Sequence, residues 1–256
     1  MISIKSSREI ELMRATSKLA SQTLEFIGEY VVPGVSTEKL DKLCHEYIMD
    51  HGAYPAPLNY HGFPKSICTS KNEVICHGIP SKKDIIKDGD ILNIDVTTKL
   101  NGFHGDTNKT FFVGEVKPEI KKLVDVTYEC MWEGIRQVKP GNRIGDIGGA
   151  ISKLAAEHNY GVVEEYCGHG IGREFHEEPQ VVHSAESGTG AVMKKGMTFT
   201  IEPMINLGSR HCLLLDDDWT VITKDRKWSA QFEHTILVTE TGYEVLTLRG
   251  EEKNKS

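Results

Sequence analysis

The segment ILNIDVTTKLNGFHGDTNKTFFV, residues 91–113, is the part of the chain that most constrains the fold. Its two ends, 91–97 and 110–113, are rich in β-branched and aromatic residues, which favour strands. Between them, Asn101-Gly102 is a strong signal for a two-residue hairpin turn. The segment therefore predicts an antiparallel hairpin.

The hairpin would also determine where its two aspartates lie. If Leu100 pairs with Phe103 across the turn, Asp95 and Asp106 share one face as diagonal neighbours, about 7–8 Å apart at the backbone. A bulge at Gly105 would change this register. A single aspartate near a turn usually caps it, whereas two on one face suggest a shared site.

Three further polar residues interrupt apolar or glycine-flanked segments elsewhere. Glu202 lies in FTIEPM at 199–204 and Glu233 in QFEHTILV at 231–238, and both segments are predicted as strands. His169 has a glycine on each side, and glycine lets a backbone approach a site closely. Taken singly, each has an ordinary alternative, namely a surface-facing glutamate or a structural histidine.

Taken together, these five residues predict a metal site. A lone charge is costly to bury, and the four carboxylates carry a charge of −4 that two divalent cations would balance. A single ion would leave −2, and each unpaired contact costs about 4 kcal/mol at roughly 4 Å and an effective dielectric near 20. A mixed oxygen and nitrogen set suits Co, Mn, Fe or Zn. Two such ions position and ionise a water for hydrolysis.

The composition is that of an ordinary globular protein. Of the 256 residues, 39% are hydrophobic, and the formal net charge of −7 argues against a dedicated nucleic-acid binder. No apolar stretch approaches the roughly 18 residues of a membrane helix, and no secretory signal is visible. The six cysteines form no C-x-x-C pair, so free thiols are expected. We therefore expect a cytoplasmic protein without a membrane span or direct nucleic-acid specificity.

The chain also carries an internal repeat with an offset of 107 residues. Pro33-Gly34 returns as Pro140-Gly141, and the same shift carries Asp95 to Glu202. The apolar face of the helix predicted from Thr37 matches as well. A chance alignment of glycines and apolar residues is the alternative. We interpret the repeat as two related halves that each bring carboxylates to the seam between them, where ligand sites are favoured.

The repeat predicts the domain organisation. We expect one α+β catalytic domain over 1–256, with halves at about 1–114 and 115–250. Its first helix begins at a capping box formed by Ser6 and Glu9. The polar end of the chain, 251–256, is expected to be a disordered tail.

The chain resembles the type I methionine aminopeptidases in their short bacterial form. The resemblance runs along essentially the whole chain and is carried by five strings: NIDVT at 93–97, GDTNKTFFVG at 105–114, GHGIGREFHEEP at 168–179, TIEPM at 200–204 and QFEHTILVT at 231–239. It implies the pita-bread fold, with two pseudo-symmetric halves and a central antiparallel sheet covered by helices. It also implies an aminopeptidase that removes the N-terminal methionine of nascent proteins when the second residue is small. In that family a hydroxide bridging two metal ions attacks the first peptide carbonyl.

The resemblance also implies roles for the five ligands. Asp95 would chelate one metal, Asp106 and Glu233 would bridge both, and His169 and Glu202 would complete the shell of the other. Glu202 would in addition carry the proton of the attacking water to the leaving amine.

Other residues acquire roles only through the resemblance. His77 would face the scissile amide nitrogen and His176 the carbonyl oxygen. The substrate pocket would consist of Tyr60, Phe63, Cys68, His77, Phe175, His176 and Trp219, where Phe63 stands at a position that is often tyrosine in the family. A monovalent cation would be bound by Asn72, Val74 and Ser229.

Several alternatives stay open on sequence alone. Proline-directed peptidases of the same fold usually carry an extra N-terminal domain, and type II methionine aminopeptidases carry an insertion for which the 25 residues between His176 and Glu202 leave no room. A metal-free binding module of this fold would have lost metal-ligating residues, whereas all five are present here. A dinuclear phosphoesterase would have the same balance between carboxylate charge and two divalent ions. We expect a monomer that meets nascent chains, with the ribosome surface as a candidate partner.

Overall fold

The predicted hairpin lies at the centre of the computed structural model, which describes residues 1–254. Its strands are β4 (Ile91–Leu100) and β5 (Phe103–Phe112), and Leu100 pairs with Phe103 as predicted. Asn101 has φ +52° and Gly102 φ +81°, the left-handed backbone that a type I′ turn requires. The ladder continues through Gly105 without a bulge, so the predicted register is confirmed.

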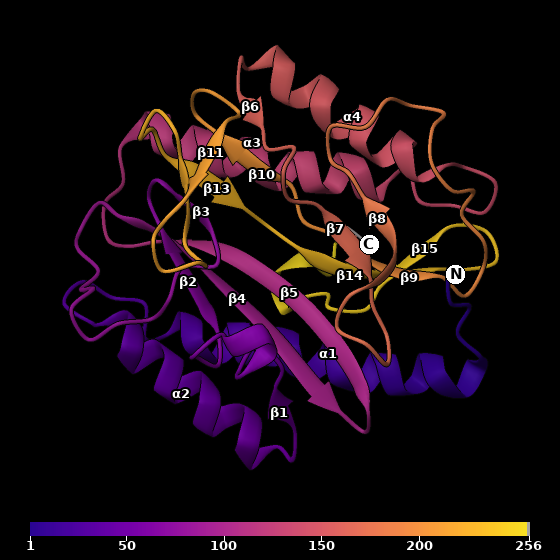
Figure 1. The fold of residues 1–256 in the computed structure, drawn as a ribbon, viewed down its shortest axis with the longest axis horizontal. Coiled ribbons are helices and arrows are strands. Elements are labelled where there is room, and N and C mark those ends of the chain that lie inside the picture. The colour runs from indigo at the N-terminus through magenta and orange to yellow at the C-terminus, as the bar shows by residue number, and fades with distance from the viewer. Residues whose placement is uncertain (255–256) are drawn as a thin grey trace.

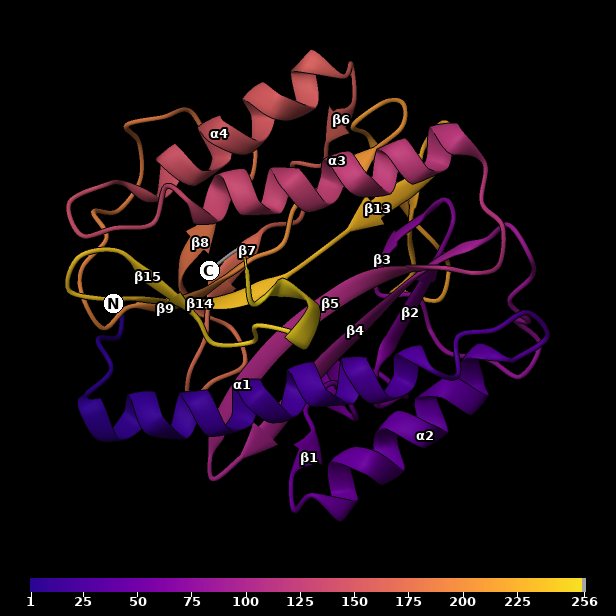
Figure 2. The same ribbon diagram turned by 180° about the vertical axis from the view of Figure 1, so that it is seen from behind.

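Four α-helices flank the strands in the described part of the chain. They are α1 (Ser7–Gly28), α2 (Thr37–Asp50), α3 (Pro118–Ile135) and α4 (Ile144–Glu157). The capping box predicted at the start of α1 is present, because the Ser6 side chain accepts from the Glu9 amide and Glu9 accepts from the Ser6 amide. Figures 1 and 2 show α1 and α2 on one side of the strands and α3 and α4 on the other.

The strands pair antiparallel throughout the recorded ladders. β4 holds β5 on one edge and β1 and β2 on the other, and the second half contributes the sheet β15-β14-β9-β7-β8. Two smaller sheets, β13-β10-β6 and β11-β12-β3, complete the set. The bounds are β1 (Tyr54–Pro55), β2 (Cys68–Lys71), β3 (Val74–Cys76), β6 (Gly161–Val162), β7 (Gly168–Gly170), β8 (Glu177–Val181), β9 (Thr198–Ile201), β10 (Met204–Asn206), β11 (Cys212–Leu214), β12 (Val221–Thr223), β13 (Ser229–Gln231), β14 (His234–Val238) and β15 (Tyr243–Val245). Two short 3-10 helices are η1 (Tyr60–Gly62) and η2 (Gly250–Glu252).

The apolar core is divided between the two groups of helices. Leu24 of α1 packs in one cluster with Ile94 of β4, and Trp132 of α3 packs in another with Phe199 of β9. Helix α1 crosses β5 so closely that a Cβ at Gly105 would collide with the backbone at Ser17. None of the helices in the described range is long and apolar enough to span a membrane.

The 107-residue repeat is visible in the backbone. Helix α4 has the bounds of α2 shifted by 107, and the isolated bridge Ser36–Ile85 returns as Arg143–Val192. The turn glycines Gly34 and Gly141 share a left-handed φ of +93° and +94°. The same local conformations therefore recur at the same places in the two halves.

The segments around Glu202 and Glu233 are not the continuous strands that the sequence predicts. Glu202 lies between β9 and β10, and Glu233 lies between β13 and β14. Pro203 cannot donate to a ladder, which explains the first interruption. Ile201 pairs with His234 and Met204 with Gln231 in one unbroken register, so the two glutamates face each other across the break.

The prediction of a disordered tail is wrong for Glu251 and Glu252. Glu251 and Glu252 belong to η2, and the Glu252 side chain is only 1% exposed. Its carboxylate lies 2.6 Å from Arg249 Nη2 and 3.2 Å from His234 Nε2. A buried arginine needs a charged partner, and the last turn of the chain supplies it. Residues 255–256 of the predicted tail lie outside the described residues.

We predict that Glu252→Ala lowers the free energy of unfolding at pH 7 by about 3–5 kcal/mol, because it removes the buried carboxylate partner of Arg249. Only the exposed Glu251, 3.8 Å from Arg249 Nε, would then pair with that buried charge among the described residues. Burial would raise the pKa of Glu252, but His234 and Arg249 hold it well below its ordinary value. The stabilisation is therefore present above the ordinary pKa of glutamate and is lost only as the pH falls well below it. Urea titrations of the wild type and the variant at pH 7 and under acid conditions measure the loss of stability and its dependence on pH.

The matched control is Glu251→Ala, one residue earlier. Its side chain is 56% exposed, pairs with Lys109 at the surface and lies 3.8 Å from Arg249 Nε, so a loss of no more than about 1 kcal/mol is expected for these solvent-exposed ion pairs. Equal destabilisation by the two variants would contradict the assigned role of Glu252.

Candidate metal centre

The five predicted ligands line one cavity of about 680 Å³. Asp95 and Asp106 come from β4 and β5 of the first half, and His169 comes from β7 of the second. The two strand interruptions supply Glu202 and Glu233. Residues spread over 139 positions therefore converge, as the sequence predicts.

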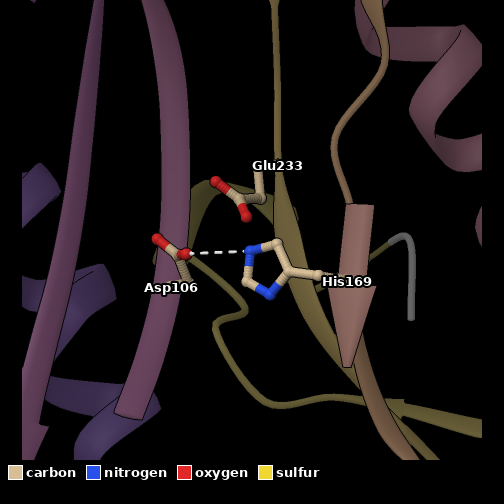
Figure 3. Close-up of side chains that lie close together, drawn as sticks. All are labelled: Asp106, His169 and Glu233. Carbon is tan, nitrogen blue, oxygen red and sulfur yellow. Dashed lines mark ion pairs between the residues drawn. The ribbon is translucent and has the colours of Figure 1, made fainter. Parts of the chain in front are cut away.

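The side chains in the centre of this group point toward one another. Figure 3 shows Asp106, His169 and Glu233 facing a common point, and one ligand atom from each lies within 4.8 Å of the others. His169 Nε2 is 3.6 Å from Asp106 Oδ2 and also 3.6 Å from Glu202 Oε1. Such spacings leave room for an ion between the atoms.

The carboxylates destabilise one another in this setting. Burial raises the pKa of Asp95 and of Glu233 well above their ordinary values, and the charge of Asp106 adds to both shifts. Burial likewise raises the pKa of Glu202 to about 7. Like charges held out of water favour the protonated form, so a bound cation would relieve a real electrostatic cost.

The hydrogen bonds of the group are those of a cation site. Buried oxygens Asp95 Oδ1 and Glu233 Oε1 have no hydrogen-bond partner within residues 1–254. His169 Nδ1 lies 3.0 Å from the Gly170 carbonyl oxygen, which orients Nε2 toward the carboxylates. Thr97 and Thr200 donate to Asp106 and Glu202 and hold them in place. The residues present thus fit divalent metal ions.

Two further histidines line the same cavity. His77 has a left-handed φ of +58°, and a Cβ on the following Gly78 would collide with the Thr69 carbonyl oxygen, so this turn is pressed against β2. Strain of this kind is typical of functional positions. Desolvation by the cavity walls lowers the pKa of His77 and, with the charge of the nearby His169, lowers that of the more exposed His176 to about 4. Both imidazoles are therefore neutral at pH 7.

The predicted substrate-pocket residues are all brought to this cavity. Phe63 is 2% exposed and meets Trp219 edge-on at 5.1 Å, while Tyr60 meets Phe175 at 4.8 Å. Cys68 pairs with Asp95 across the β2–β4 ladder, which puts the wall beside the ligands. The absence of a hydroxyl at Phe63 leaves this wall apolar.

Other residues that line the cavity were not predicted from the sequence. Tyr166 makes a ring contact with His77 at 5.6 Å, and Met204 and Cys76 lie nearby. Gln231 Nε2 donates to the backbone and carboxylate of Glu202. Gln231 could have been predicted from the sequence, because it lies two residues before Glu233 in the same predicted strand. No sequence feature indicates that Tyr166 lines the cavity.

The residues predicted to bind a monovalent cation lie at one end of β3. The Asn72 carbonyl oxygen accepts from the Ser229 amide at 2.9 Å, and Val74 begins β3 two residues further on. The structure therefore brings Asn72 and Ser229 together, and the cation itself stays a prediction.

Comparison with known proteins identifies the family. The model of metallopeptidase family M24 matches residues 11–240. A methionine aminopeptidase of Rickettsia prowazekii is 53% identical over 248 residues, covering 96% of this chain and 95% of the relative. One of Escherichia coli strain K12 is 54% identical over 251 residues, covering 97% and 94%.

Solved structures agree with the sequence relatives. The crystal structure of the Rickettsia prowazekii methionine aminopeptidase has a TM-score of 0.95 at 53% identity and covers 97% of this chain and 100% of that one. A Pyrococcus horikoshii prolidase has a TM-score of 0.74 at 24% identity and covers 96% and 63%, a likeness that shows the fold alone. The predicted α+β pita-bread fold is confirmed. This chain is a member of metallopeptidase family M24, in its type I methionine aminopeptidase branch.

Proposed function

We propose that this chain is a dinuclear-metal aminopeptidase that removes the N-terminal methionine from polypeptides whose second residue is small. The observation that carries the proposal is the convergence of four carboxylates and one imidazole on a single cavity with an aromatic wall. The family supports use of divalent metal. The number of ions, two, is our inference from the −4 charge of the ligands, and Co, Mn, Fe or Zn would suit them.

The ligands are divided as the family resemblance implies. Asp95 would hold one ion, Asp106 and Glu233 would reach both, and His169 and Glu202 would hold the second. When bound, such ions act as Lewis acids and lower the pKa of a coordinated water toward neutrality.

The chain's own residues would handle the substrate and its protons. His176 would donate to the carbonyl oxygen of the first peptide bond, where negative charge develops during attack. His77 would contact the amide nitrogen of that bond. Glu202, held by Thr200 and Gln231, would take the proton of the attacking water and deliver it to the leaving amine.

The pocket walls would select the methionine side chain. Phe63, Trp219 and Phe175 provide apolar aromatic surface, and Cys68 adds a sulfur. A thioether packs well against such walls through sulfur–aromatic contact. Discrimination against side chains that differ by one methylene is expected to be about 10–200-fold, strong rather than absolute.

We also propose the setting in which this activity operates. The substrates would be the N-termini of nascent polypeptides in the cytoplasm, met by a monomer at or near the ribosome surface. Asn72, Val74 and Ser229 would bind a monovalent cation.

Peptide hydrolysis tests the proposed function directly. The protein loaded with Mn²⁺ or Co²⁺ should release methionine from Met-Gly-Met, and a chelator should abolish the reaction until metal is restored. It should leave a phosphate ester such as p-nitrophenyl phosphate intact. Hydrolysis of the ester without release of methionine would make the protein a phosphoesterase, and binding of the peptide without cleavage would make it a binding module.

His176→Ala should lower kcat about 10²–10³-fold, the usual cost of removing one donor to a developing oxyanion. Metal content, measured by elemental analysis, should be unchanged, because His176 is not among the proposed ligands. His158→Ala, at the end of α4 and away from the cavity, is the control and should keep full activity. An unaffected rate in the His176 variant would remove its assigned role.

Metal should also stabilise the fold, because it offsets the repulsion between buried carboxylates. At free metal 100-fold above Kd, the gain is about 2.7 kcal/mol, read as a rise in Tm by calorimetry. Asp106→Asn should abolish most of this rise, whereas Asp216→Asn, on an exposed turn, should leave it unchanged. A full rise in the Asp106 variant would argue against the proposed ligand set.

A further inference from the structure

Tyr60 makes a contact that its predicted place in the pocket wall does not explain. Its hydroxyl oxygen lies 2.7 Å from His176 Nδ1, a short hydrogen bond that joins residues 116 positions apart. Within residues 1–254, the other ring nitrogen of His176 has no recorded hydrogen-bond partner. His176 lines the cavity, so Nε2 is the nitrogen left for a substrate.

The loop that carries Tyr60 is held in an uncommon conformation. Asn59 and His61, on either side of it, have left-handed φ values of +66° and +48°. Each such residue costs about 1–3 kcal/mol, and surrounding bonds must hold it. Here Tyr60 N donates to the Pro57 carbonyl oxygen at 3.0 Å and Phe63 N donates to Tyr60 O at 2.9 Å. The backbone is thus constrained at the point where the hydroxyl must be aimed.

Ring packing fixes the plane of the His176 imidazole. It stacks on Phe175 with centroids 4.3 Å apart and an interplanar angle of 22°, and its centroid is 4.2 Å from that of His169. His104 stacks on Phe175 at 5.7 Å and 10°. These contacts with flat rings do not distinguish one imidazole nitrogen from the other. A hydrogen bond is required to decide which nitrogen carries the proton.

We propose that Tyr60 is a positioning residue whose hydroxyl donates to Nδ1 of His176 and so keeps the imidazole proton on Nε2. This inference rests on the proposed function, in which Nε2–H donates to the peptide carbonyl oxygen. A carbonyl oxygen only accepts hydrogen bonds, so an imidazole with its proton on Nδ1 would present a lone pair to it from Nε2. When Nδ1 accepts from Tyr60, Nε2 must be the protonated nitrogen.

The hydroxyl carries a proton that it can donate. Burial, together with the charge of Glu174, raises the pKa of Tyr60, so the phenol keeps its proton at neutral pH. The reverse bond, from Nδ1–H to the phenol oxygen, has the same heavy-atom distance and predicts the opposite tautomer. The two arrangements are therefore separable by experiment.

The first test reads the tautomer without relying on activity. Long-range ¹H–¹⁵N spectra of zinc-loaded protein labelled with ¹⁵N-histidine report which nitrogen is protonated, and His176→Ala assigns the signal. We expect a protonated Nε2 in the wild type and a mixture of tautomers in Tyr60→Phe. A wild type protonated on Nδ1, or a Tyr60→Phe spectrum identical to wild type, would overturn the proposal.

The second test separates positioning from a wall contribution. Tyr60→Phe keeps the ring, so KM for Met-Gly-Met should hold while kcat falls about tenfold, the scale of one lost hydrogen bond. In the His176→Ala background the same change should have no further effect on kcat. A rise in KM instead, or a full loss that persists in that background, would assign Tyr60 to the pocket wall alone.

The matched control is Tyr54→Phe, which removes a hydroxyl that donates to the Leu58 carbonyl oxygen at 3.1 Å in the same loop. It should leave kcat unchanged, and an equal loss would attribute the effect to the loop. Absence of peptide hydrolysis by the wild type would refute the proposed function, while the spectra would still decide the tautomer.

Discussion

Repulsion between buried carboxylates is the constraint on which the rest of this structure depends. Asp95, Asp106, Glu202 and Glu233 share one cavity, where burial and the charge of Asp106 raise the pKa values of Asp95, Glu202 and Glu233. No arrangement of apolar residues would make that grouping favourable in the absence of cations. Two unpartnered carboxylate oxygens show that hydrogen bonds within the described chain do not satisfy the group either. The fold can hold these charges because each carboxylate lies on a strand or beside one. The favourable free energy of folding the two halves offsets the electrostatic cost of bringing the carboxylates together.

The two halves present their carboxylates differently. In the first half an uninterrupted hairpin places Asp95 and Asp106 on one face, since side chains alternate along a strand. In the second half the ladder is interrupted at Glu202 and Glu233, and the two glutamates face each other across the gap. At an interruption of the ladder, a side chain need not follow the alternation of the strand and can point into the cavity. Gln231 and Thr200 then replace the missing ladder contacts with bonds to Glu202.

Neutral histidines and aromatic rings complete the cavity beside the proposed ligands, with the His176 ring 4.2 Å from that of His169. Desolvation by the cavity walls keeps His77 and His176 uncharged, so they add no positive charge to the candidate metal site, and a neutral imidazole can still donate one directional hydrogen bond. Phe175 packs between Tyr60, His104 and His176, and its flat faces restrict the rings on both sides. Apolar walls and fixed donors together suit a substrate with one long side chain and one peptide bond to be oriented.

Local chemistry determined much of this protein by itself. The turn at Asn101-Gly102 sets the hairpin register because a two-residue turn allows only one pairing, and the capping box at Ser6 sets the start of α1 because both partners are three residues apart. The five candidate ligands could also be selected from the sequence, because a charged or imidazole side chain in an apolar or glycine-flanked segment needs an explanation. Tertiary structure alone decided the strand interruptions, the burial of Glu252 against Arg249 and the bond from Tyr60 to His176. Glu252 and Tyr60 each contact a partner that packing of the whole chain brings to them. The strand interruptions depend on how whole strands pair, and no local sequence pattern encodes that pairing.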